Sequence, residues 1–161
     1  MAGSARFELG AADRGTFLRA GYGSFGTARA VALAAPEGER RETFLAGEYA
    51  RSDGFGENRA SSRAAAVGQY ARALADGAVL RALAFAYAAR FDSAGVVRED
   101  DLAAGRDFFA TYDTRQGGFS ARHGAVVELV VPRGPRRSAV SAFVSLRELR
   151  VRENFTGFAL D

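Results

Sequence analysis

The chain is marked first by the residue types that it lacks. Its 161 residues include no cysteine, no tryptophan and no lysine, and its one histidine is His123. Without cysteine there is no disulfide framework and no thiol chemistry. A single histidine, expected at the start of a strand, gives little basis for a metal site or for base catalysis. We therefore expect no enzyme activity, no metal site and no cofactor.

Long apolar runs and concentrated charge are missing as well. No run of about 18 apolar residues is present, so no transmembrane helix is expected. The first eight residues lack the apolar region of a signal peptide. The net charge is only +3, and the 22 basic residues, all arginine, are interleaved with 19 acids. The one short basic run, at 133–137, is a weak electrostatic footprint, and we expect no nucleic-acid binding.

What the chain does contain is a repeated unit of strand, turn and strand. Its clearest example is the glycine-rich stretch 21–27, which lies between two alternating segments and predicts a tight β-hairpin. The same unit recurs along the chain. The 161 residues are enough for one domain with a core. Seven strands are predicted, at 16–22, 28–34, 42–51, 63–73, 79–91, 122–131 and 139–152, with a short β-like piece at 6–9.

The alanine-rich stretch 61–90 allows a competing interpretation. Alanine is a strong helix former, and Val67, Tyr70, Ala71 and Leu74 fit a helical repeat. A helical hairpin broken at 76–77 is therefore an alternative. The period of two in Leu83-x-Phe85-x-Tyr87 and the segment length of about 10 residues, which suits a tilted membrane-spanning strand, favour strands.

The connections between the predicted strands alternate in length. The short ones are at 36–40, 75–77 and 132–137, and the longer ones are at 52–61, 92–120 and from 153 onward. The longest carries acids at 99–101 and a glycine at 105, which predict one helical turn near 98–104. Short turns at one end and long loops at the other are typical of transmembrane β-barrels. The expected fold is therefore all-β: an antiparallel up-and-down meander of about seven strands, forming an open segment of a transmembrane β-barrel.

Such a barrel has one face toward lipid and one toward a polar lumen. The candidate lumen-facing residues are Glu48, Gln69, Glu128 and Arg147, with Ser141 beside them. The candidate residues of the interfacial aromatic girdle are Tyr22, Tyr49 and Tyr87.

Several short segments, in order, resemble landmarks of one known family. Gly21–Ala30 and Gly47–Asn58 resemble the first two barrel hairpins of TonB-dependent outer-membrane receptors. The segments 91–95, 112–118 and 152–156 resemble later landmarks of the same barrels. The resemblance covers nearly the whole chain, and it depends on the ordered set because each motif alone is weak.

The resemblance implies a receptor for a scarce nutrient, such as a ferric siderophore, a cobalamin or a glycan, energised by the TonB complex. It also implies a location in the outer membrane of a Gram-negative cell, in contact with outer-membrane lipid, although no signal peptide is recognised. Such transporters close at about 22 strands around a plug. Residues 1–161 are therefore expected to be a partial barrel domain, without the plug that contacts TonB and unable to transport alone.

The long loop supplies the candidate ligand contacts. Aromatic and arginine side chains anchor ligands well, and the loop holds Arg106, Phe108, Tyr112 and Arg115. The alternative is that these side chains only pack the loop. A small secreted lipocalin-like binding module is the alternative for the whole chain. In that case the apolar face, judged by Leu83, Phe85 and Tyr87, would point inward.

Overall fold

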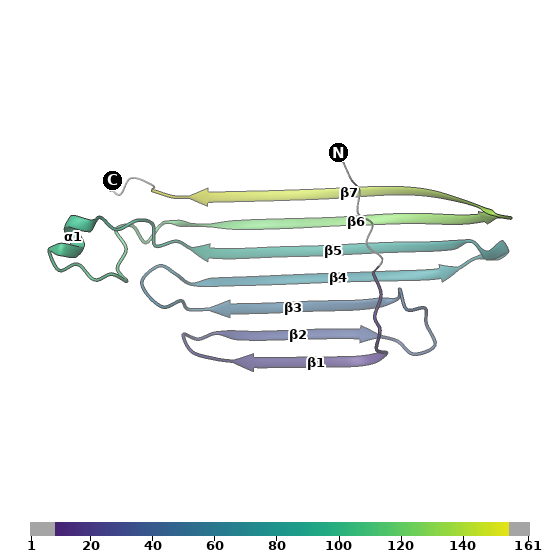
Figure 1. The fold of residues 1–161 in the computed structure, drawn as a ribbon, viewed down its shortest axis with the longest axis horizontal. Coiled ribbons are helices and arrows are strands. Elements are labelled where there is room, and N and C mark those ends of the chain that lie inside the picture. The colour runs from purple at the N-terminus through teal and green to yellow at the C-terminus, as the bar shows by residue number, and fades with distance from the viewer. Residues whose placement is uncertain (1–8, 155–161) are drawn as a thin grey trace.

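The computed structural model describes residues 9–154, and nearly all of their regular structure is one antiparallel sheet (Figure 1). Its seven strands are hydrogen-bonded in chain order, from β1 to β7. They are β1 (Gly15–Tyr22), β2 (Ala28–Ala35), β3 (Phe44–Ser52), β4 (Ser61–Ala73), β5 (Val79–Asp92), β6 (Gly117–Arg133) and β7 (Arg136–Arg152). The predicted all-β, up-and-down meander of seven strands is confirmed.

The last two strands are longer than predicted. β6 begins at Gly117 rather than at 122, and β7 begins at Arg136 rather than at 139. Only Gly134 and Pro135 form the turn between them, because Gly134 adopts a φ of 58° and Pro132 pairs with Arg137 in the ladder. Conversely, β3 begins at Phe44, so the connection at 36–43 is longer than the predicted turn. Residues 6–8 of the predicted piece at 6–9 and most of the final loop lie outside the described residues, and Leu9 is not part of a strand.

The alanine-rich stretch forms two strands and not a helical hairpin. β4 and β5 pair along their whole length, from Ser61 opposite Phe91 to Ala73 opposite Val79. The 3-10 helix η1 (Ala75–Gly77) makes the turn, where Asp76 and Gly77 both have positive φ. Each strand also pairs with a second neighbour, and these two ladders outweigh the helix propensity of alanine.

The connections gather at two ends of the sheet (Figure 1). We call the end with the connections at 23–27, 53–60 and 93–116 the loop end, and the opposite end the turn end. The longest connection contains α1 (Glu99–Ala103), which confirms the predicted helical turn. The predicted difference in length between the connections at the two ends depends mainly on two of them: the long connection 93–116 at the loop end and the two-residue turn after β6 at the turn end. The connection 36–43 at the turn end is as long as 53–60 at the loop end.

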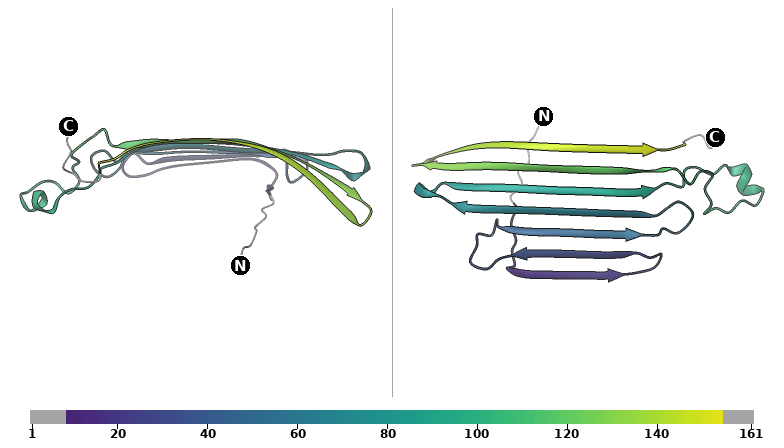
Figure 2. Two further views of the ribbon diagram at one scale, coloured as in Figure 1. Left: turned by 90° about the horizontal axis from the view of Figure 1, so that it is seen from above. Right: turned by 180° about the vertical axis from the view of Figure 1, so that it is seen from behind.

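In the described part of the chain the sheet is a single bowed layer, and no second sheet or helix covers either face (Figure 2). Among the described residues only six apolar side chains are buried, five of them alanine, and none of the large side chains is fully buried. Residues 9–154 therefore lack the expected hydrophobic core, because a single sheet has no second layer to bury its faces against. No helix of residues 9–154 is long and apolar enough to cross a membrane.

The pairing register sorts the strand residues into two faces of different chemistry. Residues directly opposite each other in a ladder share a face. Glu48 is opposite Ala65, which is opposite Tyr87. We call this side the polar face; it carries Arg19, Arg29, Glu48, Arg63, Gln69, Arg81, Arg122, Glu128, Ser141 and Arg147.

On the other side, here called the apolar face, arginines and carboxylates lie toward the two ends of the strands, and the innermost is Glu148 of β7, opposite Ala121. The central residues of this face are Leu18, Ala20 and Tyr22 of β1; Ala30 and Ala32 of β2; Leu45, Gly47 and Tyr49 of β3; Ala64, Ala66, Gly68 and Tyr70 of β4; Leu80 to Ala88, at every second position, of β5; Ala121 to Val131, at every second position, of β6; and Val140, Ala142, Val144 and Leu146 of β7.

The expectation that Leu83, Phe85 and Tyr87 lie on the face opposite the polar residues is wrong. Leu83 is opposite Gln69, and Tyr87 is aligned with Glu48 through Ala65. β5 is apolar on both sides except at Arg81 and its last residues, so its own pattern did not identify its polar side. The neighbouring strands decide this through the register.

Candidate functional site

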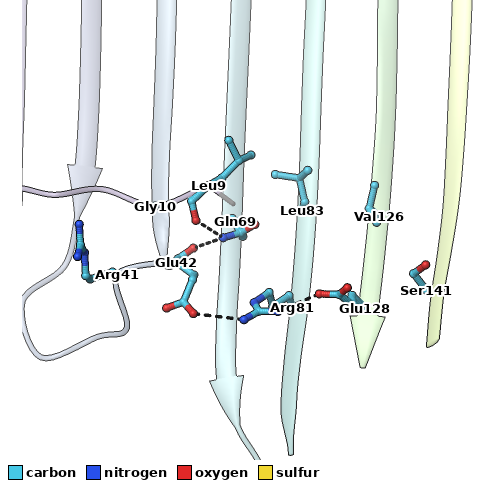
Figure 3. Close-up of a pocket in the computed structure, with 10 residues that line it drawn as sticks. All are labelled: Leu9, Gly10, Arg41, Glu42, Gln69, Arg81, Leu83, Val126, Glu128 and Ser141. Carbon is cyan, nitrogen blue, oxygen red and sulfur yellow. Dashed lines mark hydrogen bonds and ion pairs between the residues drawn. The ribbon is translucent and has the colours of Figure 1, made fainter. Parts of the chain in front are cut away.

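A hollow of about 630 Å³ lies on the polar face near the turn end (Figure 3). Its lining comes from five strands or connections and from the segment before β1: Leu9, Gly10, Arg41, Glu42, Gln69, Arg81, Leu83, Val126, Glu128 and Ser141. Two of the predicted lumen-facing residues, Gln69 and Glu128, are therefore brought together here. Ser141 joins them because it is directly opposite Glu128.

Gln69 joins the sheet to the segment that precedes it. Its side-chain nitrogen donates to the backbone oxygen of Leu9, at 3.2 Å, and to that of Glu42, at 2.8 Å (Figure 3). The backbone nitrogen of Ala11 donates to the oxygen of Arg41, at 2.9 Å. Residues 9–14 therefore lie across the polar face as a strap, on the concave side of the sheet (Figure 2).

Arg81 links two carboxylates at the edge of the hollow. Its guanidinium lies 2.9 Å from Glu128 and 3.5 Å from Glu42. Glu42 also accepts from Arg40, at 3.1 Å. This bond from Arg40, helped by Arg81, lowers the pKa of Glu42 below its usual value despite partial burial. The hollow is thus lined by compensated charges and not by a field of one sign.

A second charge cluster lies farther along the polar face, toward the loop end. Glu48 accepts from Arg29, at 2.8 Å, and from Arg63, at 2.7 Å. The three residues come from three consecutive strands, so the ion pairs join β2, β3 and β4 on the same side. Glu48 is thereby the third predicted lumen-facing residue on this face.

Arg147 also lies on the polar face, but in neither cluster. It is on the edge strand β7, directly opposite Arg122 of β6. Arg122 lies with its guanidinium carbon 5.4 Å from the ring centre of Phe85. The structure therefore places all four predicted lumen-facing residues on one face and joins only Gln69 and Glu128 in one hollow.

Most of the predicted ligand residues of the long loop contact other residues of the same loop. Arg106 lies over the ring of Tyr112, at 4.0 Å, and the Tyr112 hydroxyl donates to Asp101. Arg115 pairs with Asp113 at 2.8 Å. Phe108 differs from the other three, because 66% of it is exposed. Three of the four therefore hold the loop together, and Phe108 is available on its surface.

Two carboxylates of this loop are held in their charged form. The hydrogen bond from Tyr112, followed by that from Arg98, lowers the pKa of Asp101. The side-chain hydrogen bond from Arg115 lowers the pKa of Asp113. These bonds stabilise the ionised carboxylates and with them the local shape of the loop.

The loop end also carries an aromatic cluster that was not predicted. Phe25, Phe55, Phe109 and Phe108 form a chain of edge-to-face contacts with ring centres 5.4 to 6.4 Å apart. Arg59 lies 5.5 Å from the centre of the Phe55 ring. The four rings come from three different connections and stay largely exposed. The sequence signal was one or more phenylalanines in each of the connections at 23–27, 53–60 and 93–116, but only the fold brings them together.

Asn58 fastens two of these connections to each other. Its side-chain nitrogen donates to the backbone oxygens of Ser93, at 2.6 Å, and Gln116, at 2.8 Å. Its φ of 52° brings the side chain back toward the sheet end. Gln116 is itself buried and accepts from the backbone nitrogen of Asn154. The two ends of the 93–116 connection are therefore held at one point.

Two further expectations are corrected by the register. His123 lies within β6 on the apolar face, between Ala86 and Leu146, and not at the start of a strand, because β6 begins six residues earlier. Tyr22 and Tyr49 lie on the apolar face as a girdle requires, but Tyr87 lies on the polar face. Within residues 9–154 no three histidine or acidic side chains gather as metal ligands do.

Comparisons with known proteins add no family to this description. No family model, no curated protein and no solved structure matches the chain.

Proposed function

We propose that this sheet is a membrane-spanning part of an outer-membrane β-barrel, with the apolar face in lipid and the polar face toward the lumen. The observation that carries the proposal is the separation of the two faces. From β1 to β6, every arginine and carboxylate between the row of Arg72 and the row of Arg90 lies on the polar face, whereas on β7 the apolar face carries Glu148, opposite Ala121. Alternation of this kind is typical of membrane barrels.

The height of the uncharged band on β5 suits a bilayer. On the apolar face Arg72 is opposite Leu80, and Arg90 follows ten residues later on β5. At roughly 3.3 Å per residue this is about 33 Å along the strand. A strand tilt of about 40° reduces it to about 25 Å, the height of the apolar band in such barrels. Arginines at both borders then lie at the level of the head groups.

The exposed large side chains of this face also need an apolar environment. Leu18 and Val140 are each 73% exposed, and Leu146 is 65% exposed. In water this exposed apolar surface would contribute nothing to the stability of the fold. In a bilayer the lipid chains would cover the same surface and remove it from water.

The outer strands imply further strands beside them in the membrane. In the described sheet β1 pairs only with β2, and β7 pairs only with β6. An open edge leaves backbone donors and acceptors without partners, which hydrocarbon does not tolerate. A complete barrel therefore needs additional strands next to β1 and β7.

The lipocalin-like alternative requires the opposite polarity. A soluble barrel has a polar outer face and an apolar interior that holds the ligand. The inward position of Leu83, Phe85 and Tyr87 agrees with that alternative. The paired charges around them, and the position of the convex face's charges toward the strand ends, favour the membrane barrel.

The transport role is the finer part of the proposal and depends on the family resemblance. A TonB-dependent receptor would use the exposed aromatic cluster at the loop end, with Phe108, to meet a small-molecule ligand outside the cell. The strap at 9–14 joins the sheet from the lumen side, where the plug of such a receptor would lie.

The membrane orientation can be tested with single cysteines, which the chain lacks by nature. Ala65→Cys and Ala66→Cys place a nitroxide label on adjacent exposed alanines of β4 with opposite facing. In phosphatidylcholine vesicles we expect oxygen to relax the label at 66 and a water-soluble nickel complex to relax the label at 65. Equal response at both positions, or the reverse pattern, would contradict the proposal.

The receptor role needs a different test. Sequencing the DNA on both sides of this reading frame would reveal whether a plug-like domain precedes it and whether alternating segments of about 10 residues follow. Their presence supports a receptor. Intergenic sequence on both sides would contradict it and leave the membrane proposal to the labelling experiment.

A further inference from the structure

The tip of the β6–β7 hairpin carries two arginines on one side. Arg133 and Arg136 are the last directly opposite pair of the ladder, next to the two-residue turn. Arg133 follows Val131 at the period of two, so both arginines belong to the apolar face at the turn end. Arg137 is opposite Pro132 and therefore lies on the polar face.

Within the described residues, neither arginine has a compensating acid. Like charges directly opposite each other in a ladder destabilise it. No carboxylate of residues 9–154 forms an ion pair with either guanidinium, in contrast to Arg29, Arg63 and Arg81 on the polar face. The adjacent turn contributes Asp76, which is paired with neither. The hairpin thus presents two uncompensated guanidinium groups side by side.

The surface next to the two arginines is apolar and exposed. Leu129 and Val140 are directly opposite each other, two rows from the tip, and Val140 is 73% exposed. Arg72 lies on the same face in the row of Leu129, two strands away. A lipid with an anionic phosphate matches this arrangement, because its chains contact the apolar rows while its head group meets the guanidinium pair.

We propose that Arg133 and Arg136 bind the phosphate of an anionic phospholipid and fix the turn end of the sheet at the membrane surface. The proposal rests on the proposed membrane orientation of the apolar face. Guanidinium groups suit phosphate oxygens because their planar donors bind two oxygens at once. The pair would then be stabilised by the ligand that it binds.

The test compares two adjacent arginines of opposite facing. Arg136→Gln and Arg137→Gln remove the same charge from neighbouring exposed positions of β7. Association of the full chain is measured with vesicles of phosphatidylcholine and with vesicles in which phosphatidylglycerol replaces part of it. We expect Arg136→Gln to weaken the gain from phosphatidylglycerol about five-fold. Arg137→Gln should change it less than two-fold, with Arg133→Gln behaving like Arg136→Gln.

Equal losses for Arg136→Gln and Arg137→Gln would overturn the proposal, because they would indicate general attraction and no site. Inorganic phosphate is the second probe. If it binds the chain without vesicles with the same sensitivity to Arg136→Gln, the site takes free phosphate and the lipid assignment is wrong. The labels at 65 and 66, measured in the same vesicles, separate the two proposals. If the labels at 65 and 66 report opposite environments but Arg136→Gln and Arg137→Gln lose equal affinity, only the phospholipid site is overturned. If the two labels report the same environment but Arg136→Gln alone loses affinity, only the membrane orientation is overturned.

Discussion

The two faces of this sheet are made by the same strands, yet they treat charge in opposite ways. On the polar face, charges occur in the middle of the strands and several are compensated: Glu48 joins Arg29 and Arg63, and Arg81 joins two acids. On the apolar face, charges lie toward the strand ends, and the innermost is Glu148 of β7, which pairs with Arg150. The proposed membrane orientation accounts for this difference, because a charge in hydrocarbon costs far more than one in a wet lumen.

The difference in polarity between the two faces is seen in the rows of residues across the sheet and not in single strands. β5 alone is apolar on both faces for most of its length, and its Leu83 lies on the polar face. The row that contains Leu83 also contains Gln69, and the next row of the same face contains Arg81 opposite Glu128. Polarity therefore emerges when seven strands are aligned.

The largest expected effect comes from a charge in the middle of the apolar face. Ala66→Arg, between Gly47 and Ala86, should weaken insertion into vesicles by about 2–4 kcal/mol, the cost of arginine at the bilayer midplane. Ala65→Arg is the matched control, because that alanine lies on the polar face opposite Glu48. Insertion can be followed by protease protection. Equal losses for the two variants would break the distinction between the faces.

A smaller effect is expected at the loop end. Asn58→Gly removes two hydrogen bonds to Ser93 and Gln116 while glycine tolerates the positive φ. The 93–116 connection should lose about 1–3 kcal/mol of local stability, measured as faster hydrogen exchange there and unchanged exchange in β4 and β5. Asn58→Ala should lose more, because it adds backbone strain. An equal loss of exchange protection in β4 and β5 would mean that the connection and the sheet open as one cooperative unit.

The charge cluster of the polar face should respond less. Glu48→Gln leaves Arg29 and Arg63 without their carboxylate and should lower the unfolding midpoint in urea slightly. Glu148→Gln is the control, because that residue pairs only with Arg150 near the end of the edge strand, where both are more exposed. Its effect should be smaller still. A larger effect of Glu148→Gln would contradict the view that compensated charge matters on the polar face.

The smallest effect is that of pH on the long loop. The folded-state pKa of Asp101 and Asp113 is lowered. Their stabilisation is therefore complete above the usual aspartate pKa of about 3.9 and is lost as the pH falls through the lower folded value. The ring proton shifts of Tyr112 should change only below about pH 4. Asp101→Asn should remove that step, and a change between pH 5 and 7 would contradict the assignment.

The sequence by itself predicted the number of strands, their order and the single helical turn. Period-two alternation and turn residues are local, so Gly21–Thr27 and the alternation around Leu83 could be interpreted one segment at a time. The competing helical pattern around Tyr70 failed because hydrogen bonds to two neighbouring strands outweigh alanine's propensity.

The tertiary structure alone decided which side of each strand is which, and what meets at the loop end. A shift of one residue in register moves every side chain to the other face, and no single segment encodes it. This is why Tyr87 and His123 were misplaced and why Phe25, Phe55 and Phe109 were not predicted as one cluster. Contacts between residues far apart in the chain exist only once the whole ladder is aligned.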